Sequence, residues 1–373
     1  MDGKKRPFQK AMRHVIAILI GVLLGFGIGF GIAEAMDEMQ ASFSLLTYIA
    51  LLVWLYVCVL IAIWLHEAGH LVCGLLSGYR FVSYRAGRLM IYRKDGRFRL
   101  GLYHLPGTGG QCLMVPQTEL REPYPFVLYN LGGVLANALA AVVLAGAGLA
   151  VSHPIVRLML FMAAALQVIV GVPNLLSLKT IPTDGQNIRN MRKNEAQRIA
   201  FWRMLHTYEA LISGTPLREQ PSDWFDDTPP GEGDDPLTLS VKADTALRLT
   251  DEGRFDEALS LYRALLADSR MAQTQRNECA CELLLLLCAT EGASEETAAL
   301  ETKELRQHIA ATQSYPSRAA LALVQALSGG DVQAVEKAEL RWQKILKHHP
   351  IEGENSIYET LVQCAQTRYA AAK

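Results

Sequence analysis

The sequence predicts a mainly α-helical protein, in which a polytopic bundle of membrane helices with a small β-hairpin precedes a soluble, repeat-like helical domain. Three features of the 373 residues lead to this prediction. Long apolar stretches fill the first half, a short alternating segment interrupts them, and the second half is polar with apolar residues at helical spacing. A chain of this length has room for two or more domains.

Four stretches are apolar enough to cross a bilayer, which takes about 20 residues; they cover roughly residues 15–33, 45–65, 126–151 and 155–178. The second runs on past Leu65, through residues 66–70, and ends near Leu76. A cleaved signal peptide is the alternative for the first stretch, although its length and spaced glycines favour a retained, closely packed helix.

Charged residues flank these stretches unevenly. The segments before the first stretch and between the second and third are rich in Lys and Arg, whereas the loop after the first stretch carries only acidic charges. Because positively charged loops stay in the cytosol, we expect a multi-pass protein of the cell membrane with a cytosolic N-terminus, middle loop and C-terminal half. The seven irregularly spaced cysteines are expected to be reduced.

The second stretch contains an HExxH motif, His66-Glu67-Ala68-Gly69-His70. On a helix the two histidines lie one turn apart and can bind one zinc ion, while Glu67 can take a proton from water. A chance match is the alternative, but ionisable residues inside a membrane helix are costly unless they have a function. The motif therefore predicts a Zn²⁺ site with Glu67 as general base.

A catalytic zinc needs a third protein ligand and an open position, and Asp184 is the candidate. It lies just past the fourth stretch, whose cytosolic end should be level with that of the second, because both stretches run in the same direction. Pro173 and Pro182 could break the helix and fold the segment back toward the histidines. The alternative role for Asp184 is an N-cap for the segment that follows.

Three motifs occur in an order that resembles the site-2 protease family of intramembrane zinc metallopeptidases. They are HEAGH, the run Gly132-Gly133-Val134-Leu135-Ala136-Asn137, and Asn174 followed by Asp184-Gly185, and they cover roughly residues 45–190. The last motif departs from the usual pattern, because Ser177 replaces a proline, Thr183 replaces a leucine and the distance to Asp184 is longer.

The resemblance implies roles for six residues: His66, His70 and Asp184 as zinc ligands, Glu67 as the catalytic glutamate, and Asn137 and Asn174 as substrate-binding residues near the active site. Asn137 has an alternative that comes from its position. It lies seven residues after Asn130 on one helical face, and the two could simply be buried packing amides.

Residues 80–105 alternate and are rich in aromatic and β-branched types, and Asp95-Gly96 is a strong signal for a hairpin turn. A sheet edge beside a membrane active site could hold the substrate as an extended strand. The alternative is a simple hairpin whose arginines contact anionic lipid headgroups.

The C-terminal half is divided by composition. Residues 186–213 are predicted as an amphipathic helix on the membrane surface, residues 214–238 as an acidic flexible linker, and residues 239–373 as a cytosolic helical domain that resembles tetratricopeptide repeats around Gly253. Further helices are expected near 273–290, 296–312, 316–328, 331–348 and 355–371. The histidines of this domain, His308, His348 and His349, are expected at the surface.

These patterns divide the chain into residues 1–43 with the first membrane helix, a metallopeptidase core at 44–185, and the three C-terminal segments. The predicted function is that of a membrane-embedded zinc metalloendopeptidase of regulated intramembrane proteolysis. Its partners would be the lipid bilayer, a membrane-protein or membrane-peptide substrate, and a protein bound by the helical domain. Nucleic acid is not expected, because 36 basic residues balance 37 acidic ones.

Two alternatives remain open: a non-proteolytic membrane scaffold with a helical-repeat domain and at most a structural metal, and a metal-dependent membrane enzyme of another class. A glutamate between the two histidines favours a peptidase over a scaffold, since a structural zinc site is normally closed by four protein ligands and needs no base.

Overall fold

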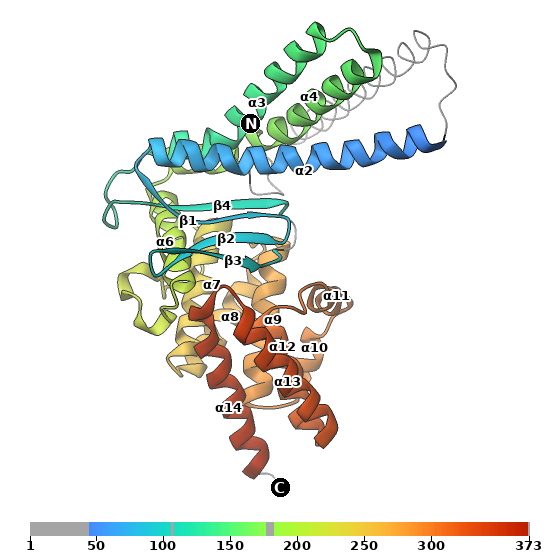
Figure 1. The fold of residues 1–373 in the computed structure, drawn as a ribbon. Coiled ribbons are helices and arrows are strands. Elements are labelled where there is room, and N and C mark those ends of the chain that lie inside the picture. Colours follow the sequence, from blue (N-terminus) through green and yellow to red (C-terminus); the bar gives the residue numbers. More distant parts are fainter. Residues whose placement is uncertain (1–44, 106–107, 177–182, 372–373) are drawn as a thin grey trace, which may run out of the picture. The chain divides into compact units, whose positions relative to one another are not determined.

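The computed structural model describes residues 45–105, 108–176 and 183–371 (Figure 1). In these ranges the chain has 13 α-helices and a small antiparallel sheet of four strands, which confirms the predicted mainly helical fold class. The chain divides into two compact units. Of the described residues, the first unit comprises 45–70, 131–176 and 183–185, and the second comprises 71–105, 108–130 and 186–371. The middle loop, predicted as part of the membrane core, is thus grouped with the C-terminal half.

Three helices of the described chain are long and apolar enough to cross a membrane: α2 (Leu45–Leu76), α3 (Phe126–Ala150) and α4 (Pro154–Leu175). They correspond to the second, third and fourth predicted stretches, whereas the first, residues 15–33, lies outside the described residues. Large apolar side chains on these helices are exposed, including Leu52 at 66 %, Val142 at 71 % and Leu149 at 80 %. Exposing so much apolar surface is unfavourable in water, so these helices suit a lipid environment.

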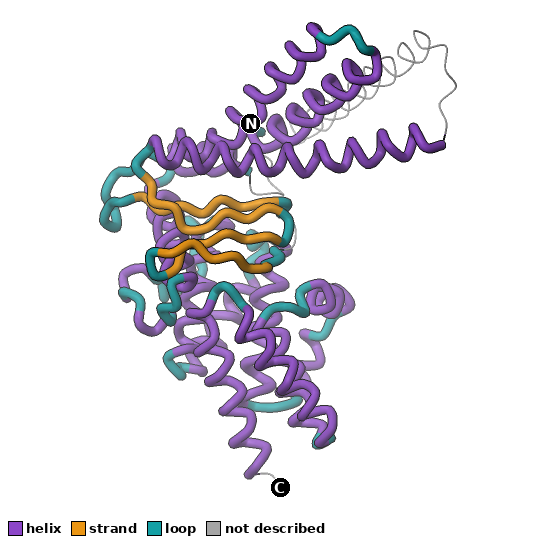
Figure 2. Tube along the Cα trace, viewed as in Figure 1, coloured by secondary structure: helices purple, strands orange, loops and turns teal. Residues whose placement is uncertain are grey.

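The middle loop folds into one sheet with the strand order β3-β2-β1-β4 (Figure 2). Its strands are β1 (Tyr79–Ala86), β2 (Leu89–Lys94), β3 (Arg97–Leu102) and β4 (Gly110–Pro116). The predicted hairpin is confirmed: Lys94 pairs with Arg97, and the two turn residues Asp95 and Gly96 have positive φ angles of 51° and 72°. A two-residue turn of this kind matches the twist of antiparallel strands.

The segment predicted as a membrane-surface helix forms two helices, α5 (Asp184–Lys193) and α6 (Glu195–Ile212). The apolar residues of α6, among them Phe201, Trp202 and Leu205, are buried, and the helix contacts β4 and α7 (Pro236–Asp251). The predicted position on the membrane surface is therefore corrected, because protein rather than lipid covers this apolar face.

Residues 214–238, predicted as a flexible linker, also differ from that prediction. They contain two short 3-10 helices, η1 (Leu217–Glu219) and η2 (Ser222–Trp224), and they bury Leu217 and Phe225 in the hydrophobic core. The apolar residues among the prolines and acids thus attach this segment to the helical domain.

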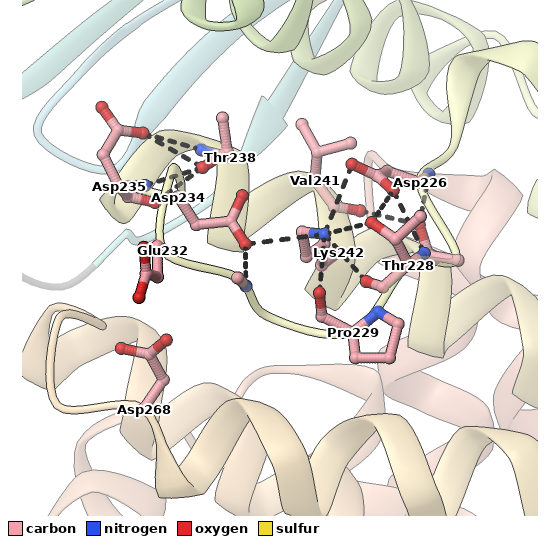
Figure 3. Close-up of polar contacts among 12 residues, drawn as sticks. Asp226, Thr228, Pro229, Glu232, Asp234, Asp235, Thr238, Val241, Lys242 and Asp268 are labelled. Carbon is pink, nitrogen blue, oxygen red and sulfur yellow. Dashed lines mark hydrogen bonds and ion pairs between the residues drawn. The ribbon is translucent and has the colours of Figure 1, made fainter.

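A buried lysine holds the acidic part of the same segment (Figure 3). The Nζ atom of Lys242, a residue only 2 % exposed, donates to the carbonyl oxygen of Thr228 at 2.8 Å. It also lies 3.5 Å from a carboxylate oxygen of Asp226 and 3.6 Å from one of Asp234. A buried charge is tolerated only when it is paired and hydrogen-bonded. The two carboxylates and the carbonyl oxygen therefore stabilise the buried ammonium group of Lys242.

The remaining helices are α8 (Phe255–Ala267), α9 (Gln273–Thr290), α10 (Glu295–Leu300), α11 (Lys303–Ala311), α12 (Pro316–Gly329), α13 (Val332–His348), η3 (Glu352–Glu354) and α14 (Asn355–Ala371). Helices α7 and α8 form the predicted hairpin, whose turn places Gly253 at a φ of +75°. The helix predicted over 296–312 is divided into α10 and α11. Thr302 caps α11, because its side chain accepts a hydrogen bond from the backbone N–H of Leu305.

Candidate metal centre

Helix α2 presents His66 and His70 one turn apart, as the motif predicts. Both side chains are buried, and their ring centroids lie 4.9 Å apart. Glu67, between them in the sequence, is 8 % exposed. Three ionisable residues are thus gathered in a helix that is otherwise apolar, where such groups need partners.

Glycines allow α3 to approach this part of α2. A Cβ atom on Gly69 would lie 2.1 Å from the carbonyl oxygen of Gly132, and one on Gly133 would lie 2.4 Å from Nε2 of His66. The first contact shows that the backbones of α2 and α3 meet directly at Gly69 and Gly132, and the second shows that a side chain at Gly133 would displace the His66 ring. The pair Gly132-Gly133 therefore fixes the space in which the His66 ring lies.

Asp184 is held against the end of α4. The hydroxyl of Thr183 donates to the carbonyl oxygen of Leu176 at 2.8 Å, and a Cβ atom on Gly185 would lie 1.9 Å from the carbonyl oxygen of Leu175. The residues on both sides of Asp184 thus contact the last turn of α4. Asp184 is also the first residue of α5, where its charge suits the helix dipole, so the helix-start role and the ligand role are compatible.

The three predicted ligands lie together within the first unit. One carboxylate oxygen of Asp184, Oδ2, lies 3.1 Å from Nε2 of His66 and 3.4 Å from Nε2 of His70. One potential ligand atom from each residue can be chosen so that all lie within 4.8 Å of one another. In a tetrahedral zinc site with bonds of about 2.0–2.2 Å, ligand atoms are about 3.3–3.6 Å apart. The spacing of these side chains therefore fits one ion.

The charge on Asp184 suits the same role. Burial alone would raise the pKa of this carboxyl, but the neighbouring imidazoles of His66 and His70 hold the pKa below its usual value. The carboxylate is the form that binds a metal.

Asn137 of α3 orients His66 from the other side of the ring. Its Oδ1 lies 2.7 Å from Nδ1 of His66, and its Nδ2 donates to the carbonyl oxygen of Ala62 at 3.0 Å and to Oε1 of Gln167 at 2.6 Å. With both Nδ2 hydrogens donated, Oδ1 can only accept, so the proton of the ring is on Nδ1. Nε2, the ring nitrogen of His66 that faces Asp184, is then the one that can bind a metal.

Gln167 is the functional residue that sequence reasoning missed. It is 1 % exposed, and it fixes the amide orientation of Asn137. A single glutamine in the apolar helix α4 was the available signal, because a polar side chain at such a position needs a partner.

Asn174 is not brought to the ligands by any contact among the described residues. Its Nδ2 donates to the carbonyl oxygen of Val170, one turn earlier in α4. The structure thus places Asn137 at the metal centre and leaves the predicted role of Asn174 without a contact to support it.

Neither a family model, nor a curated protein, nor a solved structure matches this chain. What the centre can do is accordingly argued from its own residues.

Proposed function

We propose that this chain is a membrane-embedded zinc metalloendopeptidase that hydrolyses peptide bonds of membrane-associated substrates within or near the bilayer. The observation that supports the proposal best is the convergence of His66, His70 and Asp184 on one point, beside the glutamate of an HExxH motif. Two imidazoles and a carboxylate form a donor set typical of catalytic zinc.

The number of ligands favours catalysis over a structural metal. Among the described residues the group contains three ligands, and Cys73, three residues beyond His70, is not one of them. A three-ligand site leaves a position open for water or substrate, whereas structural zinc sites are closed by four protein ligands.

Bound Zn²⁺ would supply a Lewis acid for the scissile carbonyl and would lower the pKa of a water molecule at the open position. Glu67 accepts the proton of the attacking water and delivers it to the leaving amine. Asn137 keeps His66 in the tautomer that a ligand requires.

An extended substrate is compatible with the sheet. β3 is an edge strand, and its side chains Phe98, Leu100 and Leu102 are each at least 70 % exposed. A peptide added to this edge would exchange backbone hydrogen bonds and meet apolar side chains. We therefore propose that β3 holds the substrate as a strand.

The proposed location is the cell membrane, with a multi-pass topology and with the N-terminus and C-terminal domain in the cytosol. The length and composition of α2, α3 and α4 support it, as do the basic flanks of these helices.

The test compares membranes of cells that express the full chain, the Glu67→Gln variant or the Glu359→Gln variant, which changes an exposed glutamate of α14. New protein termini, identified by mass spectrometry, should appear with the full chain and Glu359→Gln, and should decrease about 10²–10⁴-fold with Glu67→Gln, because general-base catalysis contributes that much. Zinc content should be equal in all three proteins. Identical fragments with Glu67→Gln would favour the scaffold alternative instead.

A further inference from the structure

A charged pocket lies within the second unit, between the connection from β4 to α3 and one face of α6. Its volume is about 270 Å³, and residues 121–124 with Phe126 line one side while Glu195, Arg198, Ile199 and Trp202 of α6 line the other. Pockets for drug-sized ligands are usually larger, at about 300–1,000 Å³. The size therefore suits a small polar group.

The pocket contains charges of both signs. Arg121 and Arg198 supply guanidinium groups, and Glu122 and Glu195 supply carboxylates. Within the described residues, neither arginine forms an ion pair, and the one side-chain hydrogen bond of Arg198 goes from Nη1 to the carbonyl oxygen of Met191. Two arginines without carboxylate partners are suited to bind an anion.

Arg121 has an unusual backbone for such a residue. Its φ angle is +74°, and the only other positive φ on a non-glycine residue in the described ranges belongs to Asp95 of the hairpin turn. A positive φ angle on a residue other than glycine is strained and persists only where the surrounding structure enforces it, often at ligand sites.

Aromatic side chains form the wall of the pocket, and their polar atoms are already used. The hydroxyl of Tyr124 donates to the carbonyl oxygen of Arg198 at 2.5 Å, and Nε1 of Trp202 donates to the carbonyl oxygen of Thr118 at 3.1 Å. Both residues are buried, so their rings have fixed positions. The groups left for a ligand are thus the two guanidinium groups, the ring surfaces and the two carboxylates, although Oε2 of Glu122 also accepts from the backbone N–H of Glu119 at 2.8 Å.

The pocket lies at the end of an apolar helix. Phe126, which lines it, is the first residue of α3, and Leu128 two residues later is 39 % exposed. If α3 crosses the membrane, as proposed above, the pocket opens at the level of the lipid headgroups. Aromatic residues together with arginine are typical of that level.

We propose that this pocket binds the headgroup of an aminophospholipid, with the phosphate between Arg121 and Arg198 and the ammonium at Glu122 and Glu195. A zwitterionic headgroup complements two positive and two negative side chains. A headgroup that carries only negative charge would be repelled by the carboxylates of Glu122 and Glu195. The acyl chains would then follow the exposed apolar residues at the start of α3. A soluble phosphate compound would lack these apolar contacts.

The experiment measures lipid binding by native mass spectrometry on the full chain in detergent, with dioleoyl phosphatidylethanolamine, dioleoyl phosphatidylglycerol and soluble phosphoethanolamine as probes. We expect phosphatidylethanolamine to bind most tightly. Arg121→Gln and Glu195→Gln, which change exposed side chains, should each weaken its binding by at least about tenfold, since a hydrogen bond to a charged group is lost. The control Arg97→Gln removes an exposed arginine of β3 and should leave binding unchanged.

Unchanged binding in Arg121→Gln would overturn the proposal, as would equal binding of phosphatidylglycerol or of soluble phosphoethanolamine. The inference rests on the proposed membrane position of α3 but not on proteolysis. Glu67→Gln should therefore bind lipid like the unaltered chain, so loss of cleavage and loss of lipid binding are separate results.

Discussion

The hydrogen bond between Asn137 and His66 determines which ring nitrogen is available to a metal. Asn137 is 1 % exposed, and both hydrogens of its amide are donated elsewhere, so its oxygen must accept from Nδ1 of His66. Partners of this kind usually contribute 10–100-fold to metal affinity. The tautomer of His66 is thus set by a residue that is not one of the three candidate ligands.

We predict that Asn137→Ala lowers zinc affinity about 10–100-fold while the chain remains folded. Competition with a chelator, followed by metal analysis, measures the affinity. Asn130→Ala is the matched control, because Asn130 is a buried asparagine of the same helix whose side chain donates to the carbonyl oxygen of Phe126 and accepts from Asn187, with no hydrogen bond to a histidine. Equal effects of the two variants would mean that Asn137 acts only through packing.

Gly133 gives a second residue-scale prediction. A Cβ atom at this position would lie 2.4 Å from Nε2 of His66, so Gly133→Ala should displace the ring and lower zinc affinity by at least about tenfold. Gly146→Ala, in the same helix, adds a methyl group to open space and should leave zinc affinity unchanged. A Gly133→Ala protein with normal zinc affinity would contradict the position given to His66.

The candidate metal site could be predicted only in part. A sequence motif defines the spacing of residues along one helix, but it does not identify the residues of other helices that surround them. His66, Glu67 and His70 follow from the HExxH pattern, and Asp184 followed from the expected level of two helix ends. Gln167 could not be found in the same way, since a lone amide belongs to no motif and its partner is 30 residues away in the sequence.

At the scale of elements, long periodic helices were predictable and short or buried pieces were not. Helix α9 (Gln273–Thr290) begins and ends where its pattern predicts. Strand β4 was missed, because its residues Cys112, Leu113, Met114 and Val115 are all buried and therefore do not alternate between apolar and polar types.

Amphipathic patterns identify an apolar face but not what covers it. Helix α6 shows this, since its apolar face packs against protein rather than lipid. The prediction that His308 and His349 lie at the surface is wrong for the same reason. Nε2 of His308 lies 2.8 Å from Oε1 of Glu278 and its side chain is 9 % exposed, while burial lowers the pKa of His349 to about 4.

The helical domain contains carboxyl groups that should make its stability depend on pH. Burial raises the pKa of Glu354 in η3 to about 8, with a further rise from Glu282, and burial raises the pKa values of Glu282 and Asp244 to about 7. The folded chain therefore keeps protons that the unfolded chain, with ordinary carboxyl pKa values near about 4, has already released. Its free energy of unfolding must then fall as the pH rises toward 8.

We predict that the free energy of unfolding decreases between pH 6 and pH 8 and that Glu354→Gln removes about 2 kcal/mol of this decrease. Thermal unfolding of the full chain in detergent, followed by circular dichroism at several pH values, measures it. Glu359→Gln, at an exposed position of the neighbouring helix, should keep the original slope. A Glu354→Gln profile parallel to that of the unaltered chain would show that Glu354 is not protonated in the folded state.

For the whole molecule, the sequence shows an apolar half and a polar half. The order of segments along the chain does not show which segments belong to the same compact unit. The loop between α2 and α3 is grouped with the C-terminal helices in the second unit, although it interrupts the apolar stretches. Contacts between residues far apart in the sequence underlie this grouping. The hydroxyl of Tyr315, for example, donates to the carbonyl oxygen of His104.

The proposed topology predicts where tags are accessible. Reporter tags before residue 14 and after residue 373 should both report the cytosol, and a tag in the loop at 34–44 should report the outside, because that loop carries acidic residues and no Lys or Arg. Fluorescent and alkaline phosphatase fusions measure the two sides. An external C-terminal tag would contradict the proposed orientation.

The central claim is that His66, His70 and Asp184 hold a zinc ion that Glu67 uses without binding it. Zinc content per purified chain, measured by inductively coupled plasma mass spectrometry, tests it most directly. We expect about one zinc per chain for the unaltered protein and for Glu67→Gln, and almost none for His66→Ala, His70→Ala or Asp184→Ala, since two ligands hold zinc too weakly to survive purification. Zinc retained in Asp184→Ala, or lost in Glu67→Gln, would contradict it.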